Sequence, residues 1–224
     1  MVPSNILQRV FNLRMDSRIG TGFTIEVDNR QYLITAKHVV GSSAPSGMIE
    51  IFHDNAWVAG PYRIIPVEPE VVDIAVLALS QQLAGVLPVT LGFKGAFLSQ
   101  SVFFIGFPFG LSIDGRAVNS GYPIPLVKHG ILSAFFSQEG QPFIIDGINN
   151  PGFSGGPVVT AENPQKPNII GVVSGYRTST EPVFQGGQSN PDLSVRANTG
   201  LLIGFEIDYA IKAIQKNPIG APIQ

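Results

Sequence analysis

The chain has 224 residues, of which 44% are hydrophobic and only 13% are charged, and it contains 25 glycines and 18 prolines. This balance excludes intrinsic disorder and predicts many short strands joined by tight turns. The formal net charge of -2 provides no attraction for nucleic acid or for an anionic membrane surface, so we expect neither as a partner. The absence of cysteine excludes disulfides, thiolate metal sites and a cysteine nucleophile.

The N-terminal residues 1–15 contain no uninterrupted apolar segment of signal-peptide length and no small-residue cleavage site. No apolar run approaches the roughly eighteen residues that a membrane helix needs. Taken as written, the sequence predicts a protein that is not exported and that resides in the cytoplasm.

Alternation of apolar and polar residues predicts a first hairpin, with strands at 23–27 and 32–35 and a turn at 28–30. One helix is predicted at 209–216, with Asp208 as its N-cap and Asn217-Pro218 as its end. Residues 109–127 and 177–200 are expected to be long loops, which are usually functional or mobile. The chain divides into two strand-rich halves near residues 81–101. Further strands are predicted at 48–52, 57–65, 74–79, 102–106, 130–136, 143–145, 157–160, 169–174 and 201–207.

The strongest signal for chemistry is the segment 150–157, NPGFSGGP, which places Ser154 between glycines. Such glycines allow a sharp turn that directs backbone N–H groups inward, and a nucleophilic serine needs a base and such donors. Such residues more often form a Gly-Ser turn that has no catalytic role. Whether Ser154 is catalytic therefore depends on whether a histidine and an acid accompany it in the sequence. All three histidines, at 38, 53 and 129, precede Ser154, which excludes the nucleophile elbow of the α/β-hydrolases.

His38 follows an apolar strand, and Asp73 opens another. Alone, each fits a surface or packed role at a strand end, and we assign His53 and His129 to such roles. In the order His38, Asp73, Ser154 they fit the serine peptidases built from two barrels. A subtilisin-like order using Asp16 or Asp28 would require alternating helices and strands, which the pattern lacks. No cluster of metal ligands is visible, so neither a metal nor a cofactor is expected.

From about Gly20 to Ile214 the sequence resembles the trypsin-like peptidases, and in particular their bacterial HtrA/Deg branch. The matching segments are 20–23 (GTGF), 32–39 (YLITAKHV), 73–77 (DIAVL), 105–111, 128–134, 146–157 and 204–207. The resemblance implies an all-β fold of two six-stranded antiparallel β-barrels with a C-terminal α-helix, in a bacterial protein. It implies one domain over 1–224, with barrels at about 1–90 and 91–207 and the helix at about 208–216.

The resemblance also implies roles for individual residues. His38 would be the general base, Asp73 would orient it, and Ser154 would be the nucleophile. The N–H groups of Gly152, Phe153 and Ser154 would form the oxyanion hole. The pocket for the residue preceding the cut would be formed by Ile148, Ser174, Gly175, Tyr176, Gly204 and Glu206. With Ile148 at its base and Tyr176 narrowing it, this pocket favours aliphatic side chains, whereas a basic side chain would be accepted if Glu206 reached its floor.

We therefore expect a serine endopeptidase that cleaves protein or peptide substrates through an acyl-enzyme. Phe153 stands where zymogen-activated relatives carry an aspartate, so activation by a newly cut N-terminus is not expected. The sequence after the predicted helix does not match the PDZ domain that many HtrA proteins carry. Regulation through a PDZ domain is therefore not expected here. Two alternatives stay open: an inactive binding or scaffold module on a peptidase fold, and a peptidase that is latent until an activating protein partner or homo-oligomer orders its loops.

Overall fold

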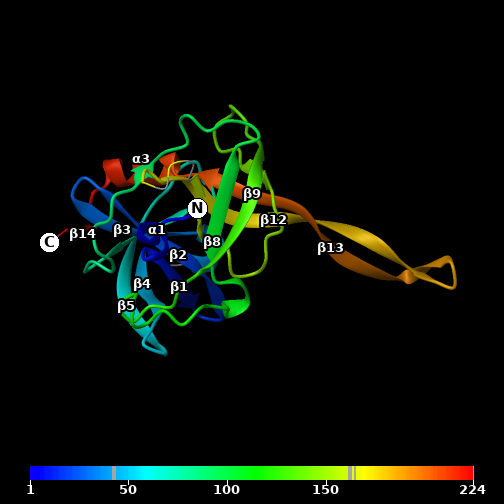
Figure 1. Cartoon of the computed structure of the whole chain (residues 1–224), viewed down its shortest axis with the longest axis horizontal. Coiled ribbons are helices and arrows are strands. Elements are labelled where there is room, and N and C mark those ends of the chain that lie inside the picture. Colours follow the sequence, from blue (N-terminus) through cyan, green and yellow to red (C-terminus); the bar gives the residue numbers. More distant parts are fainter. Residues whose placement is uncertain (42–43, 161–162, 164, 224) are drawn as a thin grey trace.

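The computed structural model describes residues 1–41, 44–160, 163 and 165–223, and strands dominate it (Figure 1). Six antiparallel strands form a first barrel, which the pairing of β3 with β6 closes. These strands are β1 (Val10–Met15), β2 (Arg18–Val27), β3 (Arg30–Thr35), β4 (Ser46–His53), β5 (Ala56–Ile65) and β6 (Ala75–Leu79).

A second set of six antiparallel strands closes through the pairing of β11 with β12. Its members are β8 (Ser101–Gly106), β9 (Leu126–Ala134), β10 (Phe143–Asp146), β11 (Pro157–Thr160), β12 (Asn168–Gln185) and β13 (Gln188–Glu206). The shorter elements are α1 (Ser4–Leu7), α2 (Lys37–Val40), β7 (Thr90–Leu91), the 3-10 helix η1 (Pro108–Gly110), α3 (Asp208–Lys216) and β14 (Ala221–Pro222). The predicted fold class, two six-stranded barrels with a C-terminal helix, is confirmed.

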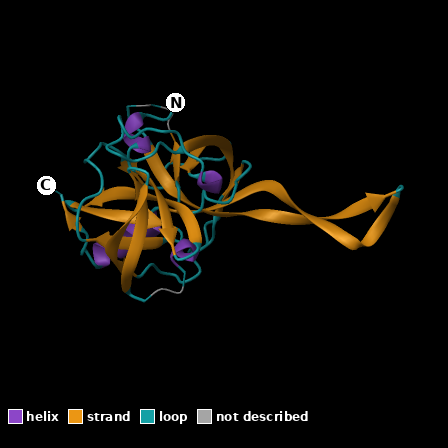
Figure 2. Cartoon of the chain, turned by 90° about the horizontal axis from the view of Figure 1, so that it is seen from below, coloured by secondary structure: helices purple, strands orange, loops and turns teal. Residues whose placement is uncertain are grey.

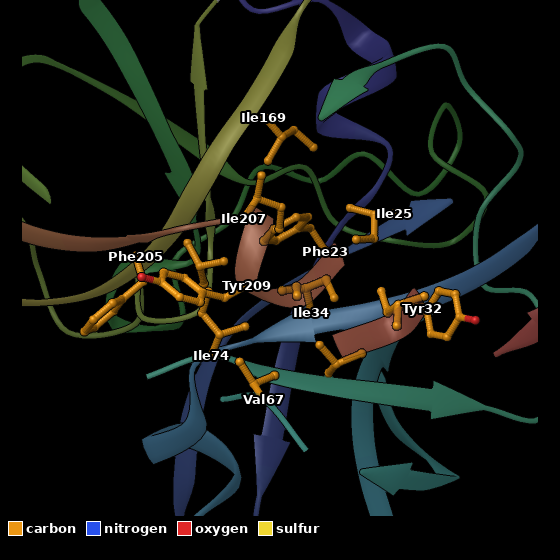
Figure 3. Close-up of a cluster of buried hydrophobic side chains, with 14 of the residues drawn as sticks. Phe23, Ile25, Tyr32, Ile34, Val67, Ile74, Ile169, Phe205, Ile207 and Tyr209 are labelled. Carbon is orange, nitrogen blue, oxygen red and sulfur yellow. The ribbon is translucent and has the colours of Figure 1, made fainter. Parts of the chain in front are cut away.

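Three clusters of buried apolar side chains hold these elements together. One lies inside each barrel, and the third joins the outer faces of both barrels to α3 (Figure 3). Strand β3 contributes to two of them, because successive side chains point to opposite faces of a strand. Leu33 points into the first barrel, whereas Ile34 joins the shared cluster with Val172 of β12 and Ala213 of α3. The shared cluster therefore fixes the two barrels relative to each other, and with them the residues in the cleft between.

Strand β1 lies outside every strand that the alternating pattern predicts. Its burial explains the omission, since five of its six residues are buried and only Arg14 is partly exposed. A strand that is buried on both faces shows no alternation of polar and apolar residues. Here the requirement to close the barrel decides the conformation, rather than a local pattern.

The expectation of a loop at 177–200 is wrong. Beyond the second barrel, β12 and β13 continue as a two-stranded ribbon, which we call the arm and define as residues 177–200. Both views show it projecting from the body of the molecule (Figures 1 and 2). Gly186 and Gly187, with φ of 60° and 81°, form the turn at its tip. Because both faces of the arm are largely exposed, its sequence lacks the apolar face by which strands are recognised.

Two smaller expectations also differ from the structure. Asp208 is the first residue of α3 and not its N-cap, which is Ile207. The carboxylate of Asp208 instead accepts a hydrogen bond from the N–H of Phe93 at 2.7 Å, linking the helix to the segment between the barrels. The strand expected at 130–136 is β9, which begins earlier, at Leu126, and ends at Ala134.

Candidate active site

The pairing of β3 with β6 brings His38 next to Asp73. Thr35 lies opposite Ala75 in this pair, so the residues just after β3 and just before β6 are neighbours. Helix α2 begins at Lys37 and presents His38, whose N–H donates to Oδ1 of Asp73 at 2.9 Å. The imidazole Nδ1 of His38 lies 2.7 Å from Oδ2 of Asp73.

Asp73 is set up to remain ionised. Burial would raise its pKa, but hydrogen bonds from His38 and from the Ser174 hydroxyl, which donates at 2.6 Å, outweigh burial and hold the pKa of Asp73 below its ordinary value. An ionised carboxylate can only accept hydrogen bonds, so the proton of a neutral His38 ring lies on Nδ1. This leaves Nε2 of His38 as the acceptor, which is the state that a general base requires.

Ser154 comes from the turn that precedes β11 in the second barrel. Three backbone hydrogen bonds hold this turn: Gly155 N–H to Val173 C=O at 2.7 Å, Val173 N–H to Gly156 C=O at 2.9 Å, and Gly156 N–H to Phe153 C=O at 2.9 Å. The hydroxyl of Ser154 donates to the carbonyl oxygen of Ser174 at 3.0 Å. Its single proton therefore points to β12, and it must swing toward His38 before a transfer.

Gly152 has a conformation that only glycine adopts readily, with φ of +105°. A Cβ at this position would also collide with the carbonyl oxygen of Phe107. The carbonyl of Pro151 accepts a hydrogen bond from Phe109 N–H at 2.8 Å, and in a trans peptide the next N–H points the opposite way. The N–H of Gly152 is thus turned away from η1.

The three N–H groups expected in the oxyanion hole are not equivalent. The N–H of Phe153 donates to Asn150 C=O at 3.2 Å. For the N–H groups of Gly152 and Ser154, no acceptor is found among the described residues. Two donors are therefore open to an incoming oxygen, and the third is engaged within the turn.

Thr21 of β2 ties the first barrel to the serine turn, which the sequence did not reveal. Its hydroxyl donates to Gly152 C=O at 2.6 Å and accepts from Phe107 N–H at 3.0 Å. Its own N–H donates to Ser154 C=O at 2.8 Å. Thr21 lies in the GTGF segment, and that motif was the only signal of its importance.

Lys128 of β9 supports the same turn from the second barrel. Its ammonium group donates to Ile148 C=O and to Oδ1 of Asn150, the latter at 3.0 Å, and lies 5.9 Å from the ring centre of Phe153. Burial lowers the pKa of Lys128. Its place in the matching segment 128–134 is the only sequence signal for this residue, because its partners lie about twenty positions further along the chain.

An open cleft of about 480 Å³ joins these groups to the root of the arm. It is lined by His38, Ser154, Ser174, Gly175, Tyr176, Thr178, Arg196 and Asn198. Three of the six residues expected in the substrate pocket, at positions 174–176, thus line the same cleft as Ser154. The arm residues Thr178, Arg196 and Asn198 were missed, since their segment was expected to be a loop.

The other three expected pocket residues lie outside this lining. Ile148 is 60% exposed, and its carbonyl accepts from Lys128. Gly204 faces the ring of Phe143. Glu206 pairs with Gly171 in the sheet, and burial, with the nearby Asp208 charge, raises its pKa. Their part in substrate selection stays a prediction.

The remaining histidines have local partners. His53 packs against the Tyr122 ring, and Nε2 of His129 lies 2.5 Å from the Ser101 hydroxyl oxygen. Among the described residues, no group of three His, Cys, Asp or Glu side chains is placed to hold a metal ion. Within the same residues, no helix is both long and apolar enough to span a membrane.

Comparison with known proteins identifies the family and supports the fold. Residues 20–165 match the family model described as trypsin-like peptidase domain. A solved structure of the HtrA-type protease AlgW with tripeptide is similar to this chain, with a TM-score of 0.60 and 22% sequence identity. The match covers 96% of this chain and 62% of that one, and at this identity it shows the fold. A search of curated protein sequences finds no match.

Proposed function

The chain belongs to the trypsin-like peptidase family, and on this premise we propose that it is a serine endopeptidase whose catalytic triad is His38, Asp73 and Ser154. The observation that carries the proposal is the cleft in which Ser154 and His38 meet, with Asp73 bonded to the imidazole behind it. Protein or peptide substrates follow from the family, and the acyl-enzyme route follows from the serine nucleophile.

In the proposed mechanism Nε2 of His38 takes the proton of Ser154 as the hydroxyl oxygen attacks the scissile carbonyl. Asp73 keeps the proton on Nδ1 and stabilises the imidazolium that forms. The N–H groups of Gly152 and Ser154 receive the developing negative charge on the carbonyl oxygen. His38 then protonates the leaving amine, and a water molecule, activated by the same base, hydrolyses the acyl-enzyme. No step requires a metal or cofactor.

The hydrogen bond from Ser154 to the carbonyl of Ser174 supports a resting state that precedes catalysis. We infer that substrate or an activating protein partner, or assembly into a homo-oligomer, favours the rotamer in which Ser154 donates to His38. Rotation about one side-chain bond is enough for this change. The arrangement of Asp73, His38 and Ser174 needs no adjustment.

For the residue preceding the cut, we propose a small or medium aliphatic side chain. Tyr176 lines the cleft, and the described lining residues include no acidic side chain to pair with a basic one. Glu206 lies outside the lining of the cleft and pairs with Gly171 in the sheet, so it is not placed to meet a basic side chain there. Cleavage of a diverse peptide library only after Arg or Lys would contradict this preference.

Labelling with a fluorophosphonate probe tests the proposal, because the probe reacts with an activated serine. The wild-type protein should be labelled, and Ser154→Ala and His38→Ala should not be. Circular dichroism of each variant checks that the fold is retained. A correctly folded wild type that is not labelled, either alone or with cell extract, would favour an inactive binding or scaffold module.

A further inference from the structure

The cleft does not end at the catalytic groups but continues onto the arm. Its lining runs from Ser154 along β12 to Thr178 and across to Arg196 and Asn198 of β13. We propose that the root of the arm binds the stretch of substrate that precedes the scissile bond and selects acidic side chains there through Arg196. This inference rests on the proposed peptidase function and names the substrate class of the same cleft.

The exposed edge of β12 offers the backbone part of this binding. On one side β12 pairs with β11 from Asn168 to Val172, and on the other with β13 along nearly all its length. Beyond Val173, the first edge has no strand beside it among the described residues. It passes Ser174, whose carbonyl holds the Ser154 hydroxyl, and continues into the arm. An unpaired edge of this kind accepts an extended peptide as an added strand.

Arg196 offers the side-chain part. It is the only lining residue with a permanent charge, and no ion pair joins it to an acidic side chain of the described residues. Its one recorded hydrogen bond runs from Nη2 to the Thr178 hydroxyl at 3.2 Å. A guanidinium group carries five N–H donors in a planar fork that fits a carboxylate. Apart from the bond to Thr178, these donors have no acceptor among the described residues.

The register of the arm places this charge relative to the cut. Thr178 lies opposite Asn198, and Thr180 lies opposite Arg196, so these side chains share one face of the ribbon. Thr178 is four residues beyond Ser174, a distance of about 13 Å along an extended strand. If the residue preceding the cut lies at Ser174 to Tyr176, the acidic side chain falls three to five positions before the scissile bond.

The arm is also held at its root, which keeps this face directed at the cleft. The side chain of Asn198 donates to Asn149 C=O at 2.7 Å, and Asn149 donates to Gly175 C=O at 3.1 Å. Asn149 is buried directly before the serine turn. The position of Arg196 is therefore coupled to the body of the second barrel, although the tip of the arm projects into solvent.

The experiment uses the full chain with Ser154→Ala, so that binding is measured without cleavage. Two fluorescein-labelled peptides of twelve residues are compared by anisotropy, identical except for three Glu or three Gln at the third to fifth positions before a central Val-Ala bond. We expect the Glu peptide to bind about tenfold more tightly, as for hydrogen bonds to a charged group, with a difference that shrinks as salt is added. Adding Arg196→Gln should abolish this difference, and Arg196→Glu should weaken the Glu peptide further.

Arg177→Gln is the matched control, since Arg177 carries the same charge on the same arm but does not line the cleft. It should leave the Glu preference unchanged. Equal affinities for the two peptides, no measurable binding of either, or a Glu preference that survives Arg196→Glu would each overturn the inference. Fluorophosphonate labelling separates the two ideas: labelled wild type without a Glu preference refutes only this inference, and the reverse result refutes only the proposed catalysis.

Discussion

The two barrels contribute differently to the candidate active site. The first barrel holds His38 and Asp73 in contact at 2.7 Å, with Asp73 ionised and the imidazole oriented. The second barrel supplies Ser154, but its hydroxyl donates to Ser174 of its own barrel. The proposed base is thus held by its carboxylate, whereas the hydroxyl of the proposed nucleophile is bonded within its own barrel. Under the proposed function, this difference predicts that activity is controlled through the serine turn and the contacts that support it.

The largest effect is expected from removing a reacting group of either barrel. His38→Ala and Ser154→Ala should each lower turnover of casein by a factor on the order of 10⁶, because base and nucleophile act in one step. The double variant should be little worse than either single one. Rates from purified proteins with matched circular dichroism spectra test this. If the losses in the double variant multiplied, the two barrels would act independently.

Asp73→Asn should have the next largest effect, a loss of turnover on the order of 10⁴. An amide in place of the carboxylate offers an N–H where His38 needs an acceptor, which favours the wrong tautomer. Because Ser154 and its turn are untouched, KM for a peptide substrate should change little. A kcat within tenfold of wild type would show that the contact at 2.7 Å is not used in catalysis.

The residues that meet in the cleft were predictable where local pattern and chain order both point to them. His38 follows a strand, Asp73 opens one, and Ser154 sits between glycines, so each has a recognisable setting in the sequence. The pairing of β3 with β6 then brings the first two together. The fold class followed from the same strand spacing and from the resemblance to one family.

The contacts that support the serine turn could not be predicted from the sequence, and the reason is physical. Thr21 and Lys128 act on the serine turn through partners that are remote in sequence, and neither has an unusual local setting. The strands of the arm were not predicted, because a strand is recognised in a sequence by the burial of one face, and both faces of the arm are largely exposed. Arg196 therefore could not be placed beside Ser154 before the ribbon was known.

Thr21→Val tests the link between the barrels and should have the third largest effect. Valine keeps the shape but leaves Gly152 C=O and Phe107 N–H without their partner, which should lower the free energy of unfolding by about 1 to 3 kcal/mol. Turnover should fall as well, since the N–H of Gly152 is one of the two proposed oxyanion donors. Thermal and urea unfolding measure the loss, and Thr21→Ser is the control that keeps the hydroxyl. A Thr21→Val variant as stable and as active as wild type would show that the hydroxyl does not stabilise the link between the barrels.

Lys128→Met changes a residue of the second barrel and should lower kcat by about tenfold. This reduction is smaller than the one expected when a complete oxyanion donor is removed. Methionine is also long and unbranched, but it lacks the ammonium group that holds Ile148 C=O and Asn150. The measurement is kcat against KM for one peptide, with KM expected to stay near the wild-type value. Lys94→Met, which removes an exposed lysine, is the control. A change in KM alone would place Lys128 in substrate binding instead.

The smallest effect concerns acid stability and the charge of Asp73 in the first barrel. The folded-state pKa of Asp73 is lowered, so its ionised form adds stability above the unfolded-state pKa of roughly 3.9, and this contribution is lost as the pH falls through the folded-state pKa. Wild type should therefore have a higher free energy of unfolding than Asp73→Asn, and this difference should be largest near pH 6. The difference should become smaller from about pH 4 downward. Asp192→Asn, on the exposed arm, should track wild type throughout this range. A gap between wild type and Asp73→Asn that stayed constant down to about pH 2.5 would mean that Asp73 stabilises the barrel by its shape rather than by its charge.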